Sequence, residues 1–254
     1  MAFEMLVVLV ALAIVAALYS SVGHGGASGY LAILSLTSFG LLGSSWLKQH
    51  AWSMNLVVAS MAFWHYYKAG YHVPKLTIPF IVASIPMALL GGYLRVDGVV
   101  YDTLLSVALI WAAWRLMTVK PITSDEKMEA PELNIALPIG GVIGLASGIV
   151  GVGGGIFLSP IILLKKWATP KTAAATSALF IWVNSAAGMV GAAVSGQLEL
   201  QVDVLFPFIV AVLIGGYIGS NYGAKIASQN KIKTLLVIVL VVAAIRRILE
   251  VISN

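Results

Sequence analysis

The chain carries only one charged side chain, Glu4, before Lys48, and this shortage of charge constrains the fold more than any other feature of the sequence. Over the whole chain 60% of residues are hydrophobic and 10% are charged, whereas a soluble domain carries about 25% charged residues. So few polar side chains cannot cover a surface that faces water, and lipid must therefore surround most of the chain. Because helices satisfy their own backbone hydrogen bonds in lipid, we predict an all-α polytopic membrane protein.

Short polar or glycine-rich stretches divide the chain into apolar segments. A helix that crosses a bilayer needs about 20 residues, and several segments are shorter than this. We therefore expect about ten transmembrane or re-entrant helical segments, at residues 3–21, 29–44, 50–68, 75–95, 99–118, 135–149, 155–167, 172–195, 203–224 and 232–252.

The pattern of the first half of the chain recurs in the second half. Val22-Gly23-His24-Gly25-Gly26 matches Val150-Gly151-Val152-Gly153-Gly154, and Gly91-Gly92-Tyr93-Leu94 matches Gly215-Gly216-Tyr217-Ile218. Self-similarity in a constant order indicates an internal repeat. The sequence thus predicts two five-segment repeats, at 1–118 and 134–254, joined by an acidic linker at 119–133.

The basic residues predict how the two repeats are oriented. Because five is odd, the second repeat must enter the membrane from the face opposite to the first. With the linker in the cytoplasm, the outer side has Lys48, Arg95, Arg246 and Arg247, and the other eleven of the 15 basic residues lie inside. Both termini are then expected outside. Inverted-topology repeats are typical of secondary transporters, which bind substrate between the repeats near the midplane.

A glycine-rich turn precedes the short second segment of each repeat. Glycine permits left-handed backbone and close approach of a ligand, and a helix N-terminus attracts anions. Glycines also let membrane helices pack closely, and polar residues on the third segments can either bind substrate or tie helices together. The candidate substrate-binding residues are Gly23, His24, Gly25, Gly26, Gly151, Gly153, Gly154 and Gly155 in the turns, with Ser53, Asn55, Thr176, Ser177 and Asn184 on the third segments.

The positions of the ionisable residues favour an anionic or neutral substrate. All 10 acidic residues lie in the linker, in loops or within about a turn of a segment end, whereas carriers of cations usually need a carboxylate inside the membrane. His24 is the titratable group within the proposed site, as a proton-coupling candidate or as a neutral structural histidine. The tryptophans mostly mark the membrane interfaces; they are Trp46, Trp52, Trp64, Trp111, Trp114, Trp167 and Trp182.

Two motifs of the second repeat resemble a known family. Gly148-Ile149-Val150-Gly151-Val152-Gly153-Gly154-Gly155 followed by Pro160, together with Ala175-Thr176-Ser177, is similar to the pattern of the TauE/SafE sulfite exporter family, the TSUP transporters. The first repeat departs from that pattern at His24 and Ala27. The resemblance covers essentially the whole chain. It implies a multi-pass transporter of the cytoplasmic (inner) membrane that moves sulfite, organosulfonates or sulfoacetate.

Other classes of function fit the sequence less well. Gly26-Ala27-Ser28-Gly29 matches the serine motif of rhomboid intramembrane proteases, but the repeat places Ile156 opposite Ser28 and the other histidines are expected near the membrane surface. We therefore expect no enzyme, and an anion channel or a carrier of another small solute stays as the alternative. The expected partners are a small anion and membrane lipids, with a homodimer left open. No nucleic acid, cofactor or metal is expected.

Overall fold

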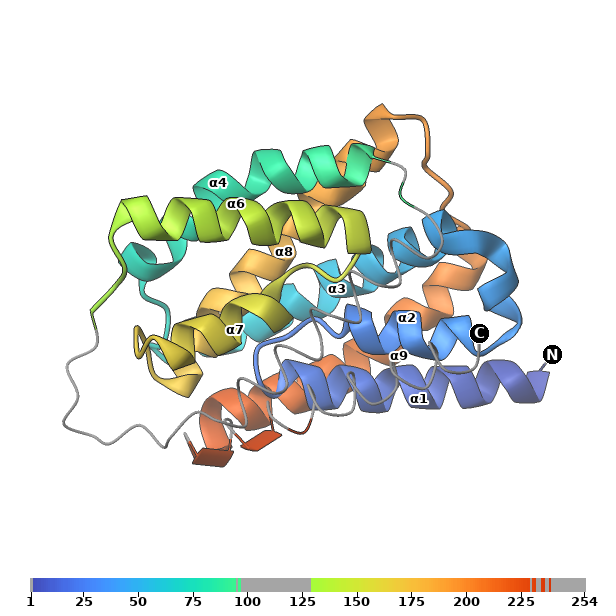
Figure 1. Cartoon of the computed structure of the whole chain (residues 1–254). Helices are drawn as coiled ribbons and strands as arrows, with labels where there is room; N and C mark the ends of the chain where they lie inside the picture. The colour runs from blue at the N-terminus through green and yellow to red at the C-terminus, as the bar shows by residue number, and fades with distance from the viewer. Residues whose placement is uncertain are drawn as a thin grey trace.

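The computed structural model describes residues 2–94, 96 and 129–228, together with 230, 231, 234, 235 and 238. Throughout this part of the chain the backbone forms helices and short connections, without a strand. Figure 1 shows α4 and α6 side by side at the top and α1 with α9 at the bottom, with α3 and α8 between them. The helices are α1 (Ala2–Ser20), α2 (Ala27–Ser35), a 3₁₀ turn η1 (Ser38–Leu42), α3 (Gly43–Lys68), α4 (Pro74–Tyr93), α6 (Leu133–Val150), α7 (Gly155–Leu164), α8 (Pro170–Val194), α9 (Val202–Asn221) and a π turn η2 (Tyr222–Ile226).

Five of the described helices are long and apolar enough to cross a membrane: α1, α4, α6, α8, and α9 with its π turn. A sixth span results if α2 is joined to η1 and α3, across a bend of 95°. The described part of the chain is therefore all-helical, with several candidate membrane spans. Seven of the ten predicted segments coincide with described helices, and an eighth, 29–44, is divided between α2, η1 and the start of α3. Segment 99–118, nearly all of 232–252 and most of the linker lie outside the described residues, so the ten-segment inverted arrangement stays a prediction.

The second segment of each half is a short helix, of 9 residues in α2 and 10 residues in α7. Neither reaches the length of about 20 residues that a bilayer requires. The structure also divides the predicted segment 29–44. Helix α2 ends at Ser35, and the Thr37 hydroxyl donates to the Leu34 carbonyl of its last turn (2.8 Å). The next long helix, α3, begins at Gly43, seven residues before the predicted start at residue 50.

Rows of glycine bring the first helix of each half against the fourth helix of the other half. A Cβ atom placed on any of these glycines would overlap a backbone carbonyl of the facing helix, which is how small residues let membrane helices approach. One row lies on α6 and packs on α4. The other row runs from α9 into η2 and packs on the C-terminal half of α1. The pairs are Gly140 with Phe80, Gly144 with Ser84, Gly148 with Ala88, Gly215 with Ala13, Gly219 with Ala17 and Gly223 with Ser21.

The repeated Gly-Gly pairs make matching contacts in the two halves. Gly91 faces α6 and Gly92 faces Gly188 of α8. In the same way, Gly215 faces α1 and Gly216 faces α3. Each fourth helix therefore packs against the first and third helices of the other half. These exchanged contacts bring the two glycine-rich turns to the middle of the molecule.

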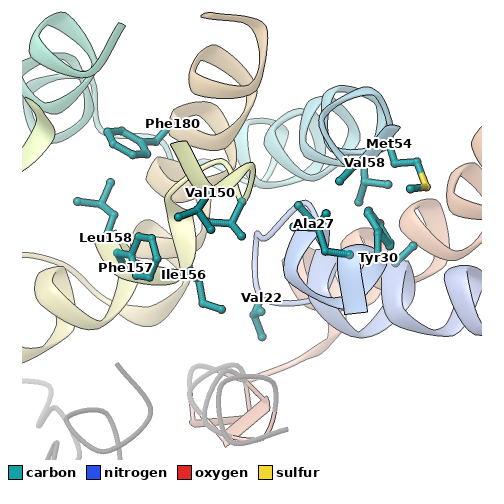
Figure 2. Close-up of a cluster of buried hydrophobic side chains, with 14 of the residues drawn as sticks. Val22, Ala27, Tyr30, Met54, Val58, Val150, Ile156, Phe157, Leu158 and Phe180 are labelled. Carbon is teal, nitrogen blue, oxygen red and sulfur yellow. The ribbon is translucent and has the colours of Figure 1, made fainter. Parts of the chain in front are cut away.

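Apolar side chains surround the two turns. Figure 2 shows residues of α7 with Val150 and Phe180 on one side and residues of α2 and α3 on the other, with Val22 of the first turn between the two groups in this view. All are buried. The two turns consequently lie within an apolar environment, where each hydrogen bond is stronger than it is in water. The labelled residues are Val22, Ala27, Tyr30, Met54, Val58, Val150, Ile156, Phe157, Leu158 and Phe180.

Candidate substrate site at the glycine turns

The first turn joins α1 to α2 and rests on the backbone of α8. Gly23 and Gly26 have φ of +77° and +100°, in the left-handed region that glycine adopts readily. The His24 amide donates to the Tyr19 carbonyl (2.9 Å), which closes the turn. A Cβ atom on Gly23 would overlap the backbone of Ala174. Any side chain at Gly23 would therefore push the turn away from α8.

The second turn joins α6 to α7 and has three glycines with positive φ. They are Gly151 (+86°), Gly153 (+74°) and Gly154 (+82°). A Cβ atom on Gly151 would lie 2.8 Å from the side chain of Lys48, and one on Gly153 would lie 2.8 Å from Ile181. The second turn thus packs against both α3 and α8.

The two turns meet at the side chain of Asn55. Its Oδ1 accepts from the amide of Ala27, the first residue of α2 (3.0 Å), and its Nδ2 donates to Ser185 Oγ on α8 (3.3 Å). A Cβ atom on Gly25 would overlap Asn55 Oδ1, and one on Gly153 would lie 2.9 Å from Nδ2. One fully buried amide therefore contacts both turns and links the two halves.

His24 forms a second link between the halves. Its Nε2 lies 2.9 Å from Ser159 Oγ on α7, and Ser159 Oγ lies 2.6 Å from Ser177 Oγ on α8. The imidazole is 1% exposed, and its Nδ1 has no hydrogen-bond partner among the described residues. The Tyr30 hydroxyl also stabilises the first turn by donating to the Gly25 carbonyl (2.7 Å). The first turn is therefore held by several hydrogen bonds.

Comparison with known proteins identifies the family. The model of the family described as "Sulfite exporter TauE/SafE" matches residues 7–247, nearly the whole chain.

This chain belongs to the TauE/SafE family.

Individual relatives of this TauE/SafE protein are named as membrane transporters. The chain is 32% identical to the probable membrane transporter protein y4hK of Sinorhizobium fredii, over 93% of this chain and 95% of that protein. It is 29% identical to the probable membrane transporter protein YunE of Bacillus subtilis, over 44% of this chain and 38% of that protein. A probable membrane transporter protein of Xylella fastidiosa is 31% identical over 41% of this chain and 39% of that protein. No solved structure matches the chain significantly.

The predicted polar residues of this TauE/SafE protein differ in their surroundings. The Ser53 hydroxyl donates to the Gln49 carbonyl of its own helix (2.9 Å), and Thr176 Oγ1 lies 2.9 Å from Thr77 Oγ1 of α4. These two hydroxyls therefore serve helix contacts in this structure. Asn184 is 1% exposed, and neither its Nδ2 nor its Oδ1 has a partner among the described residues. That these residues bind substrate stays a prediction.

Gly155, the remaining glycine of the predicted site, is the first residue of α7 and lies against Ile181 and Ser177. Among the described residues, no three His, Asp or Glu side chains lie close enough together to hold a metal ion.

Several residues near the turns were not expected from the sequence. Ser159, Ser185 and Tyr30 bond to the turns or to Asn55, and Ser147 Oγ lies beside Gly154. The sequence offered a signal for Ser159 alone, which follows Gly155 of the second glycine turn by one helical turn. That the tryptophans mostly mark the membrane interfaces stays a prediction. Trp46 and Trp52 are 3% and 1% exposed, because α3 is enclosed by helices of both halves.

Proposed function

We propose that this protein is a secondary transporter for small sulfur-containing anions, which bind between the two glycine turns. The observation that carries the proposal is the meeting of both turns at Asn55, where α2 and α7 also begin. The family description, which names sulfite export, and the names of the relatives support this class of substrate and function. We propose no enzymatic activity.

The charges around the turns favour an anion. Among the described residues, the buried lysines are Lys48 and Lys171, and no aspartate or glutamate is buried. The first N–H groups of a helix have no partner within the helix, and the helix dipole adds positive potential there. At α7 the N-cap residue is Gly154, which has no side chain to satisfy them. An anion is therefore a suitable ligand for this helix end.

Alternating access requires that the two halves move relative to each other around the site. Among the described residues, the hydrogen bonds of Asn55 with Ser185 and of His24 with Ser159 join the halves at the site. The proposal includes the inverted topology, with the linker in the cytoplasm and both termini outside. The exchanged packing of α4 and α9 supports it, because equivalent helices make equivalent contacts.

Flux measurements test the function. The purified protein is reconstituted in liposomes and supplied with sulfite, sulfate, thiosulfate, taurine or sulfoacetate, with and without a pH gradient. We expect uptake that saturates with concentration and is accelerated by the same anion on the opposite side. Uptake that rises linearly without counterflow would indicate a channel instead, and absence of flux for every sulfur anion would overturn the proposal.

Labelling of single cysteines tests the topology. The chain contains no cysteine, and both Glu129 and Glu199 are exposed. Glu129→Cys should react with a membrane-impermeant maleimide only from the cytoplasmic side, and Glu199→Cys only from the outside. Reaction of both residues from the same side would contradict the inverted arrangement.

A further inference from the structure

The surface where α3 meets α9 carries two lysines at one end. Lys68 is the last residue of α3, in the first half, and Lys225 lies in η2, which continues α9 in the second half. Both side chains are exposed. The two elements are in contact here, because His65 Nδ1 lies 2.8 Å from Ser220 Oγ. The fold therefore places one cation from each half at the same end of the molecule.

The two lysines converge on the same histidine. The positive charges of Lys68 and Lys225 both act on the His65 imidazole, one from α3 and one from η2. Lys68 Nζ also lies 4.2 Å from the centre of the Trp64 ring, in a cation–π contact. This contact positions the ammonium group but does not neutralise its charge. An ammonium group has three N–H donors, so Lys68 can still bond an anion.

Neither element has a carboxylate near these lysines. No Asp or Glu occurs in α3, and none occurs from residue 204 to residue 249. Asp203 begins α9 and lies at its other end, roughly 30 Å from Lys225 along the helix. The α4–α6 side of the molecule differs, since Lys75 at the start of α4 has Glu132 at the start of the neighbouring α6. Among the described residues, the α3–α9 side therefore keeps a net positive charge.

Exposed apolar side chains surround the lysines. Trp64 and Tyr217 are 54% and 58% exposed, and the Tyr217 ring packs edge-on against His65. Exposed aromatic side chains of membrane proteins are enriched at the level of the lipid headgroups. Ile214 and Ile226 extend the apolar surface along α9 and η2. A ligand that covers this surface needs an anionic head and a hydrocarbon body.

We propose that Lys68, Lys225, Trp64 and Tyr217 bind an anionic phospholipid; we call these four residues the lysine seam. The lipid phosphate accepts from the two ammonium groups, and the acyl chains cover the apolar face of α9. A zwitterionic lipid binds less well, because its own cationic group meets the two lysines. A soluble phosphate leaves the apolar side chains uncovered. The bound phosphate links the two halves at this end, apart from the glycine turns.

Lipid binding to the purified protein in detergent tests the inference. Phosphatidylglycerol and phosphatidylcholine with identical acyl chains are added, bound lipid is counted by native mass spectrometry, and the melting temperature is followed. We expect phosphatidylglycerol to bind more tightly, by about fivefold for each lysine, and to raise the melting temperature more. Equal binding of the two lipids would overturn the inference.

Variants of the seam locate the effect. Lys68→Gln and Lys225→Gln should each weaken phosphatidylglycerol binding about fivefold and leave phosphatidylcholine binding unchanged. Lys68→Arg keeps the charge and should keep the preference. Lys75→Gln is the matched control, because it removes an equal charge from an exposed side chain at the same end. If it reduced the preference as much as Lys68→Gln does, overall charge would explain the binding and the seam would not be a site.

A soluble ligand distinguishes a lipid from a small anion. Glycerol 3-phosphate carries a phosphate ester without acyl chains, and it should not displace phosphatidylglycerol at equal concentration. Displacement by glycerol 3-phosphate would assign the seam to a small anion and overturn the inference. The result does not depend on the transported substrate, because flux of sulfur anions through the wild-type protein tests the proposed function separately.

Discussion

The two glycine turns differ in how their polar neighbours are satisfied. At the first turn, Asn55 bonds the start of α2, the Tyr30 hydroxyl bonds the Gly25 carbonyl, and His24 bonds Ser159. At the second turn, Ser147 Oγ and both amide atoms of Asn184 lack partners among the described residues. Two turns with the same glycine pattern therefore have different chemistry. Among the described residues, one of these polar atoms, His24 Nδ1, lacks a partner at the first turn, whereas three lack one at the second, so the second turn offers more unpaired groups to a ligand.

The largest effect is expected from side chains added to the turns. Gly153→Leu and Gly25→Leu should each abolish transport, since the new side chain would displace Asn55 or Ile181. Gly70→Leu is the control: Gly70 also has a positive φ, of +80°, but nothing lies within 4 Å of an added Cβ atom. It should cost about 1–2 kcal/mol of stability and keep transport. Liposome uptake and membrane abundance are measured for all three. Transport with unchanged apparent affinity in either turn variant would mean that this turn only packs.

Opposite changes in stability are expected from the two asparagines. Asn55→Leu leaves the Ala27 amide and Ser185 without their partner, and should lower the free energy of unfolding by about 1–3 kcal/mol. Asn184→Leu removes two unpartnered atoms and should leave the ligand-free stability unchanged or raised. Thermal unfolding in detergent measures both. A loss of stability in Asn184→Leu as large as that in Asn55→Leu would remove the contrast between the turns.

The smallest effect is expected at His24. His24→Gln should retain part of the uptake, because an amide can still bond Ser159, but should flatten the pH dependence of uptake only below about pH 6.5, because burial lowers the pKa of His24. Ser159→Ala is the control, since it removes the partner and keeps the imidazole. Uptake is measured over this pH range at equal protein abundance. A well-expressed His24→Gln variant with the wild-type pH profile would exclude His24 as the coupling group.

Local patterns predicted the helical class and the turns well, because both depend on neighbouring residues. Low charge indicated lipid, and repeated glycines marked positions where the backbone is left-handed. The central role of Asn55 could not be predicted, because its partners Ala27 and Ser185 lie 28 and 130 residues away in the sequence. Ser147 and Ser159 were missed for the same reason. A single serine in an apolar helix has no local signature, and only the packing of α6, α7 and α8 shows which way it faces.

The exchanged packing of the fourth helices has a consequence for synthesis of the chain. The face of α1 that carries Ala13 and Ala17 is covered by α9, which follows about 180 residues later. At ribosomal rates of about 5–20 residues per second, α1 waits roughly 10–40 s in the bilayer before its partner is made. Lipid must cover this face meanwhile, and α4 waits in the same way for α6. Neither half can complete its packing alone, so folding ends only after the last helices have been inserted.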